Sequence, residues 1–247
     1  MEFRFDANNY EFNKKSEKAV YLLHGFSSTT YEVKDLAQYL AKNGYHTIAK
    51  NLPGHGTSPE ECNSIKFHHW LDFIKKDIAQ LSNKAEKIYV VGNSMGGVLS
   101  LYLASFFPID AYVAAGTVLK FKSFFNTNIL VPLLCNFVPF QKKTKVLKHK
   151  NAKFYGYKEY PLKALNEYRK MIYVVLKRIH YIKIPGLIIH SHSDQTSSKK
   201  NVDIILKHIN NNKTKTLFVD RAHHNMFDEN LDQNIIFENI LSFLNNN

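Results

Sequence analysis

The chain has 247 residues, of which 45% are hydrophobic and 22% charged, and this composition excludes a disordered chain. Its length supports one large domain with a buried core. The formal net charge of +12 comes mainly from lysine, because arginine occurs only as Arg4, Arg169, Arg178 and Arg221. Nucleic-acid recognition relies on the planar fork of arginine, so we predict no nucleic-acid partner. Scattered lysines instead predict weak attraction to anionic membrane surfaces.

The two cysteines, Cys62 and Cys135, lack the spacing of a metal site or of a disulfide framework. We therefore expect no metal and no cofactor. The first 15 residues contain no continuous apolar segment, which predicts that there is no signal peptide. The longest apolar region, at 129–140, is shorter than the roughly 18 residues of a membrane-spanning helix and is broken by Pro132 and Pro139. These features predict a cytoplasmic protein.

Short apolar runs alternate with helix-like segments along the chain. The first runs, at 3–5 and 10–12, flank the turn-rich sequence DANN and predict an edge hairpin. Strands are then expected at 19–26, 45–52, 87–94, 111–119, 184–194 and 215–223. Helices are expected at 29–44, 67–81, 95–107, 199–208 and 235–244, and a turn at 53–61. This alternation predicts an α/β fold with a mostly parallel central sheet and helices on both faces.

Residues at about 121–182 do not follow the alternation. They contain an aromatic and aliphatic run, a basic run and a predicted helix at 162–177. An insertion of this size between core strands is usually functional, so we predict a single domain over 1–247 with a helical cap over a cleft. The alternative is an extra helical layer that only enlarges the core. As a cap, the insertion would contact the substrate through its apolar residues, including Phe124, Phe125, Leu130 and Leu134.

A single serine stands between glycines where the strand at 87–94 becomes a helix. Gly92, Ser94 and Gly96 form the pattern Gly-x-Ser-x-Gly. Glycines beside such a sharp turn relieve crowding and let strand and helix approach closely. Because sites in parallel sheets form at the carboxyl ends of strands, Ser94 is a candidate nucleophile in a turn built by Gly92, Asn93 and Gly96. The alternative is an ordinary turn without chemistry.

A serine nucleophile needs a neighbouring base, and the base needs an acid to orient it. In this architecture the acid and then the base follow the serine along the chain. We expect Asp194 as the acid, because its rival Asp220 stands three residues before His223 and would have to fold back. For the base we expect His223 and keep His224 as the alternative, because the small Ala222 permits a tight loop before His223.

Two backbone N–H groups are candidates for an oxyanion hole. One belongs to Met95, which follows the candidate nucleophile at the start of a helix. The other belongs to Phe26 at the end of the strand at 19–26, where Gly25 lets the backbone bend toward the cleft. His55, in the sequence GHG, is expected to serve a structural turn.

Taken together, these residues resemble the α/β-hydrolase superfamily, and within it the small bacterial carboxylesterases and monoacylglycerol lipases. The similar segments, in family order, lie at 20–45, 52–61, 68–73, 88–104, 160–171, 184–194 and 221–229. The resemblance implies Ser94 as nucleophile, Asp194 as acid, His223 as base, Phe26 and Met95 as oxyanion donors, a cap over an acyl pocket beside Gly25, and no cofactor. Asn93 departs from the family, which often has leucine there.

The expected function is therefore hydrolysis of a small-molecule carboxylic ester with a hydrophobic acyl chain. The same triad would also serve an amidase, a peptidase or a thioesterase, and a non-catalytic protein that binds an acyl ligand is a further alternative. The lysines that follow the apolar run would hold the cap against an anionic lipid surface. These lysines are Lys142, Lys143, Lys145, Lys148 and Lys150.

Overall fold

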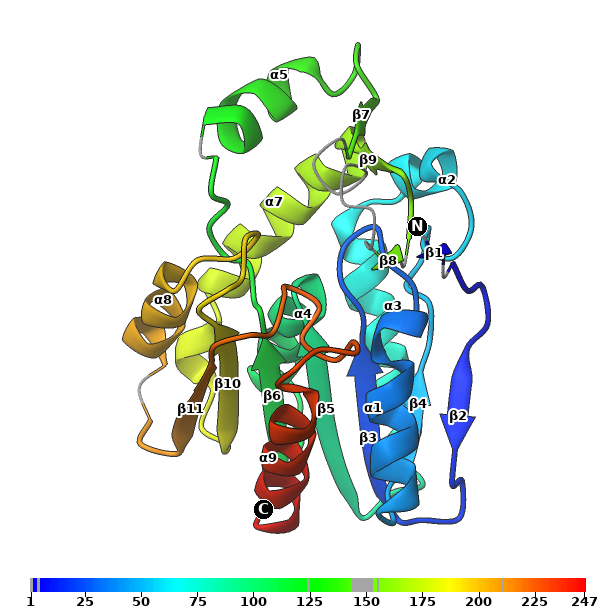
Figure 1. The fold of residues 1–247 in the computed structure, drawn as a ribbon, viewed down its shortest axis with the longest axis vertical. Coiled ribbons are helices and arrows are strands. Elements are labelled where there is room, and N and C mark those ends of the chain that lie inside the picture. Colours follow the sequence, from blue (N-terminus) through cyan, green and yellow to red (C-terminus); the bar gives the residue numbers. More distant parts are fainter. Residues whose placement is uncertain (1, 4, 124, 144–152, 155, 210) are drawn as a thin grey trace.

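A mostly parallel sheet of seven strands, in the order β11-β10-β6-β5-β3-β4-β2, forms the centre of the molecule (Figure 1). The structure is a computed structural model that describes residues 2–3, 5–123, 125–143, 153–154, 156–209 and 211–247. The central strands are β2 (Tyr10–Phe12), β3 (Lys18–Leu23), β4 (His46–Ala49), β5 (Lys87–Asn93), β6 (Ala111–Ala115), β10 (Gly186–Ser191) and β11 (Thr214–Val219). Only β2 runs antiparallel to its neighbour. The predicted α/β class is confirmed.

Helices cover both faces because each buried strand carries apolar side chains on both sides. In β3, Val20 and Leu22 pack in one core with α1 (Tyr31–Lys42) and α9 (Gln233–Asn245). Tyr21 and Leu23 pack in the other core. The helices that contribute to this second core are α3 (Phe67–Leu81), α4 (Met95–Ala104), α7 (Leu162–Leu176) and α8 (Lys200–His208).

The amino-terminal hairpin predicted from the sequence is not formed. β1 (Glu2–Phe3) instead pairs in parallel with β8 (Lys153–Phe154), and β2 joins the sheet edge beside β4. The turn-rich residues between β1 and β2 are held by more distant parts of the chain, because Asn9 Oδ1 accepts a hydrogen bond from the backbone N–H of Asn51 at 2.8 Å.

A short helix, α2 (Pro59–Ser64), begins inside the predicted turn at 53–61 and extends beyond it. Its start follows the rules for a helix amino terminus: Ser58 Oγ accepts from the N–H of Glu61 at 3.1 Å, and Pro59 occupies the first turn. The turn prediction missed this helix although the capping sequence was present.

The insertion at 121–182 divides into two parts that differ in burial. Its outer part contains η1 (Asn126–Leu130), α5 (Val131–Leu134) and the antiparallel pair β7 (Phe140–Lys142) and β9 (Glu159–Pro161). Figure 1 shows α5, β7 and β9 at the top of the molecule, beyond the ends of the sheet strands. The inner part, α7 and the short turn η2 (Ile179–Tyr181), contributes buried residues to the core beside α3 and α4. No helix in the described part of the chain is long and apolar enough to cross a membrane.

Candidate active site

Ser94 stands at the sharp turn between β5 and α4. Its backbone has φ 57° and ψ −114°, a left-handed conformation that non-glycine residues rarely adopt. Such a conformation costs about 1–3 kcal/mol and persists only where the surroundings enforce it. One constraint is the Ser94 N–H, which donates to the carbonyl oxygen of Ala115 at 2.8 Å. The turn holds the hydroxyl at the carboxyl end of the central strand.

The two glycines flanking Ser94 are required by close backbone approaches. A Cβ on Gly92 would stand 2.1 Å from the carbonyl oxygen of Gly96. A Cβ on Gly96 would stand 2.0 Å from the carbonyl oxygen of Leu23 in β3. Both contacts are far inside van der Waals distance, so the Gly-x-Ser-x-Gly pattern allows β5, α4 and β3 to pack together at this point.

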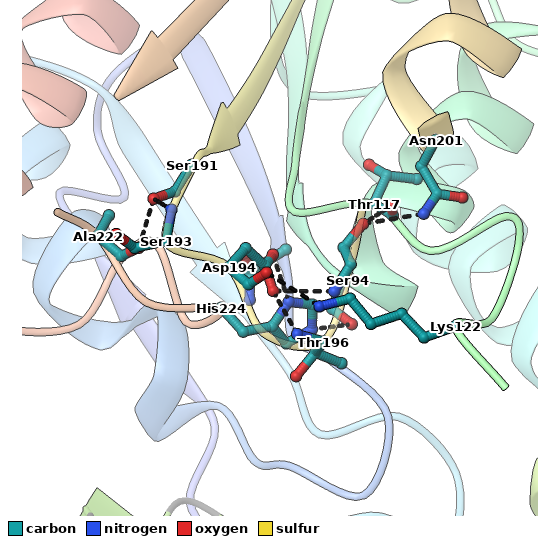
Figure 2. A network of polar contacts seen from close by, with 12 residues as sticks. Ser94, Thr117, Lys122, Ser191, Ser193, Asp194, Thr196, Asn201, Ala222 and His224 are labelled. Atoms are coloured by element: carbon teal, nitrogen blue, oxygen red, sulfur yellow. Dashed lines mark hydrogen bonds and ion pairs between the residues drawn. The ribbon is translucent and has the colours of Figure 1, made fainter. Parts of the chain in front are cut away.

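A continuous chain of polar contacts joins Ser94, His224 and Asp194 (Figure 2). His224 Nε2 lies 2.9 Å from Ser94 Oγ, and His224 Nδ1 lies 2.8 Å from Asp194 Oδ2. A neutral imidazole that donates from Nδ1 to the carboxylate presents the lone pair of Nε2 to the hydroxyl. In this tautomer His224 can accept the proton of Ser94.

Asp194 is buried and fully engaged. Its other oxygen, Oδ1, accepts hydrogen bonds from the N–H groups of Thr196 at 2.7 Å and Ser197 at 2.8 Å. Burial by itself raises the pKa of Asp194, but hydrogen bonds from His224 and these backbone groups outweigh it, so the pKa lies below its ordinary value. Asp194 is therefore a carboxylate at neutral pH and can orient a histidine.

The structure corrects the prediction of His223 as the histidine beside Ser94. His223 is exposed, whereas His224 turns inward to Ser94 and Asp194. The reason lies in the preceding residues: the N–H of Arg221 is held by Asp232 at 2.6 Å, and the Ala222 carbonyl accepts from Ser191 Oγ. With Ala222 buried between these two anchors, the chain leaves His223 exposed and brings His224 to Ser94 and Asp194.

The small Ala222, used as the reason to favour His223, is itself buried, and no local pattern in the sequence separates the two histidines. For the acid, the geometry agrees with the expectation: Asp194 contacts the imidazole, and Asp220 is exposed just beyond the end of β11.

The two predicted oxyanion donors belong to segments that meet at Ser94. Met95 is the first residue of α4, and the first N–H groups of a helix have no partner within the helix. Phe26 follows β3, and its half-buried ring packs against Trp70 and Tyr168. A Cβ on Gly25, just before Phe26, would stand 3.3 Å from Ser94 Cβ, which places this loop directly against the serine.

Ser27 anchors the same loop through three contacts that the sequence did not predict. It too has a left-handed backbone, with φ 55°. Its N–H donates to His55 Nε2 at 3.1 Å, its carbonyl accepts from the N–H of Tyr157 at 3.0 Å, and its Oγ accepts from Lys143 Nζ at 2.6 Å. Burial lowers the pKa of His55, so this ring is neutral and available as an acceptor. The expected structural role of His55 thus extends to the loop beside Ser94.

Asn93, the residue before Ser94, is completely buried. Its Nδ2 donates to Glu32 Oε1 at 2.6 Å, and Glu32 Oε2 accepts from the N–H of Gly25 at 2.7 Å. Glu32, in the first turn of α1, was not identified from the sequence, because an acidic residue there is ordinary at a helix amino terminus.

The residues predicted to contact substrate in the cap are only partly described. Phe124 lies outside the described residues. The side chains of Phe125 and Leu134 are 58% and 44% exposed, and Leu130 is half-buried. Two hollows, of about 350 and 600 Å³, adjoin Gly44 at the amino-terminal ends of the strands, away from Ser94. Within the described chain, no three His, Cys, Asp or Glu side chains are grouped as metal ligands.

Comparison with known proteins supports the resemblance to α/β-hydrolases. The sequence model of the family described as serine aminopeptidase, S33, matches residues 14–230. A thermostable monoacylglycerol lipase of Bacillus sp. strain H-257 is 28% identical over 228 residues, covering 91% of this chain and 89% of the lipase. A carboxylesterase of Bacillus subtilis strain 168 is 24% identical over 234 residues, covering 94% of each chain.

Solved structures share the fold at lower identity. A structure from the metagenome-derived lipolytic enzymes LipS and LipT has a TM-score of 0.88 at 22% identity and covers both chains completely. The monoacylglycerol lipase of Paleococcus ferrophilus has a TM-score of 0.78 at 18% identity, with 96% of this chain and 97% of the lipase covered. The chain therefore belongs to the serine aminopeptidase S33 family of α/β-hydrolases, with monoacylglycerol lipases and carboxylesterases among its relatives.

Proposed function

We propose that Ser94, His224 and Asp194 are the catalytic triad with which this enzyme, an ester hydrolase of the lipase and esterase group, cleaves carboxylic esters through an acyl-enzyme. The main support is the pair of contacts that join Ser94 Oγ to the His224 imidazole and the imidazole to the buried Asp194 carboxylate. The left-handed turn at Ser94 supports the same role, because strain of this kind is characteristic of a nucleophile held out of the sheet.

In the proposed reaction, His224 Nε2 takes the proton of Ser94 as Oγ attacks the ester carbonyl carbon. Asp194 holds the imidazole in the required tautomer and stabilises the imidazolium that forms. The imidazolium then gives its proton to the departing alcohol. Water, activated by the same imidazole, attacks the acyl-enzyme and releases the carboxylic acid with Ser94 restored.

The N–H groups of Phe26 and Met95 would donate to the oxyanion of the tetrahedral intermediate. Removing one such donor typically costs about 3–4 kcal/mol of transition-state stabilisation. Both donors belong to the backbone, so their position depends on the residues that fix the two loops. The network around Glu32 and Ser27 supports this assignment, because it holds the loop of Phe26 against Ser94.

The substrate that we propose is an ester of an alcohol such as glycerol with a hydrophobic acyl chain of modest length. The names of two relatives, a monoacylglycerol lipase and a carboxylesterase, support this choice. A screen of p-nitrophenyl esters of graded chain length, with monoacylglycerols beside them, would define the acyl and alcohol preference. Aminoacyl p-nitroanilides belong in the same screen, because the family is described as an aminopeptidase.

Ser94→Ala is the direct test of the nucleophile. We expect the variant to fold normally and to lose p-nitrophenyl ester hydrolysis by about 10³-fold or more. A fluorophosphonate probe should label the wild-type protein and not the variant. Full activity in the folded variant would overturn the proposed function, and hydrolysis without labelling would point to another nucleophile.

We further propose that the outer cap contacts a lipid surface when the enzyme meets water-insoluble esters. Exposed apolar side chains gather there: Phe125, Ile129, Leu133, Leu134, Phe137 and Val138. Lys142 is exposed at the end of the same segment, whereas Lys143, also expected at the lipid surface, donates a hydrogen bond to Ser27 Oγ instead. Lys145, Lys148 and Lys150 lie outside the described residues. Co-sedimentation with vesicles of phosphatidylcholine, with and without phosphatidylserine, tests this. Binding that needs neither the cap side chains nor anionic lipid would contradict it.

A further inference from the structure

We infer that Glu32 is a positioning residue for catalysis, which ties the loop of the proposed oxyanion donor Phe26 to the turn of the nucleophile Ser94. The inference rests on the proposed function, because it assigns Glu32 a task within that triad and oxyanion hole. Glu32 lies in α1 and only 2% of its surface is exposed, so its carboxylate is withdrawn from water. A buried carboxylate is costly unless hydrogen-bonded, and its partners show what it holds.

Each carboxylate oxygen of Glu32 is bonded to a different catalytic loop. Oε2 accepts the N–H of Gly25, the residue before Phe26, at 2.7 Å. Oε1 accepts Nδ2 of Asn93, the residue before Ser94, at 2.6 Å. Glu32 therefore connects the residues that precede one oxyanion donor and the nucleophile.

The carboxylate also packs close to the reacting serine. The point where Gly25 would carry a Cβ is 3.1 Å from Glu32 Oε2 and 3.3 Å from Ser94 Cβ. Glycine is the residue that fits between them. A shift of the Gly25 backbone would therefore move the N–H of Phe26 relative to Ser94 Oγ.

The side-chain amide of Asn93 makes one hydrogen bond among the described residues, and that bond is to Glu32. Its Nδ2 is bonded to Glu32, and its Oδ1, which is buried, has no hydrogen-bond partner among the described residues. An apolar residue would fill this buried position at lower cost unless the amide were needed. The buried amide of Asn93 is therefore retained for its bond to Glu32.

The test compares two substitutions of similar size at Glu32. Glu32→Gln keeps an acceptor for Gly25, and its amide can bond to Oδ1 of Asn93 if the Asn93 amide turns over. Glu32→Met removes both acceptors. We expect Glu32→Met to lower kcat for p-nitrophenyl esters by about 10- to 100-fold with KM within about 3-fold, because misplacing a catalytic loop by about 1 Å can cost 10²-fold. Glu32→Gln should recover most of the lost kcat.

The test remains decisive even if one variant fails to fold. If Glu32→Met does not fold, Asn93→Ala carries the test, because it removes one of the two connections and should also lower kcat without raising KM. A wild-type kcat in folded Glu32→Met would overturn the inference. Where Asn93→Ala is the variant tested, a wild-type kcat in that folded variant would do the same. An equal loss of kcat in Glu32→Met and Glu32→Gln would also overturn it. These outcomes are separate from failure of the proposed function, which would appear as full activity in Ser94→Ala.

Discussion

The loops at the carboxyl ends of the sheet strands and the outer cap, formed by η1, α5, β7 and β9, lie at the same end of the molecule but are built in opposite ways. Around the loops, Glu32, Asn93 and Asp194 are buried, and each bonds to a partner from another part of the chain. In the cap, large apolar side chains such as Phe137, 84% exposed, face outward. The first region holds polar atoms in fixed positions, and the second exposes an apolar surface.

The difference explains how each region carries function. A buried polar group is held because its alternative is an unsatisfied donor or acceptor, which costs about 1–3 kcal/mol. An exposed apolar group has no such constraint, and its surface is available to an apolar partner. Substitutions in the loops should therefore change the rate of reaction, whereas those in the outer cap should change what the enzyme associates with.

The largest effect is expected at the pair of neighbouring histidines. His224→Ala should lower kcat/KM for p-nitrophenyl esters by about 10³-fold or more, because it removes the proposed base. His223→Ala is the matched control and should stay close to wild type, since that side chain is exposed. Steady-state kinetics of the two folded variants measures this. A greater loss in His223→Ala than in His224→Ala would reverse the assignment of the base.

Gly92→Ala should give the next largest effect, this time on stability. The new Cβ would stand 2.1 Å from the Gly96 carbonyl oxygen, which belongs to backbone and cannot rotate away. We expect a loss of about 3 kcal/mol in the free energy of unfolding. Gly44→Ala, with open space but φ +95°, is the control and should lose about 1 kcal/mol. Equal losses in urea titrations would show that the β5–α4 contact is not tight.

These two experiments also separate the features that could be predicted from the sequence from those that could not. The α/β class, the helix at 67–81 and the place of Ser94 follow from apolar periodicity and glycine spacing, which are local patterns. The choice between His223 and His224 depends on the direction of a loop, which Asp232 and Ser191 fix from distant parts of the chain. Glu32 was not predicted either, because only folding brings its partners Gly25 and Asn93 to it.

A pH titration can test how firmly the cap is attached to the loops. Burial lowers the pKa of Lys143 to about 7, from an ordinary value of 10.5, while the charges of Glu32 and Cys62 act in the opposite direction. Between these two values the unfolded chain binds a proton that the folded protein lacks, so stability should rise with pH across this window. In Lys143→Met that contribution is absent.

The measurement is urea unfolding of both proteins at pH 6, 7, 8 and 9. The unfolding free energy of the wild type should rise relative to that of Lys143→Met above about pH 7. Parallel curves would mean that the ammonium stays in water and that its 2.6 Å contact with Ser27 does not attach the cap to the loop.

The smallest effect on the folded protein is expected in the outer cap, and its smallness is informative. Phe137→Ser should change the free energy of unfolding by less than about 0.5 kcal/mol and leave hydrolysis of soluble p-nitrophenyl acetate unchanged, because the ring is already in water. Val131→Ala, at a position 7% exposed in the same cap, should cost about 1.5 kcal/mol. If Phe137→Ser leaves stability intact but weakens vesicle binding, the exposed ring serves the lipid contact. If it destabilises the protein as much as Val131→Ala, the ring belongs to a packed core, and the contrast between the two regions fails.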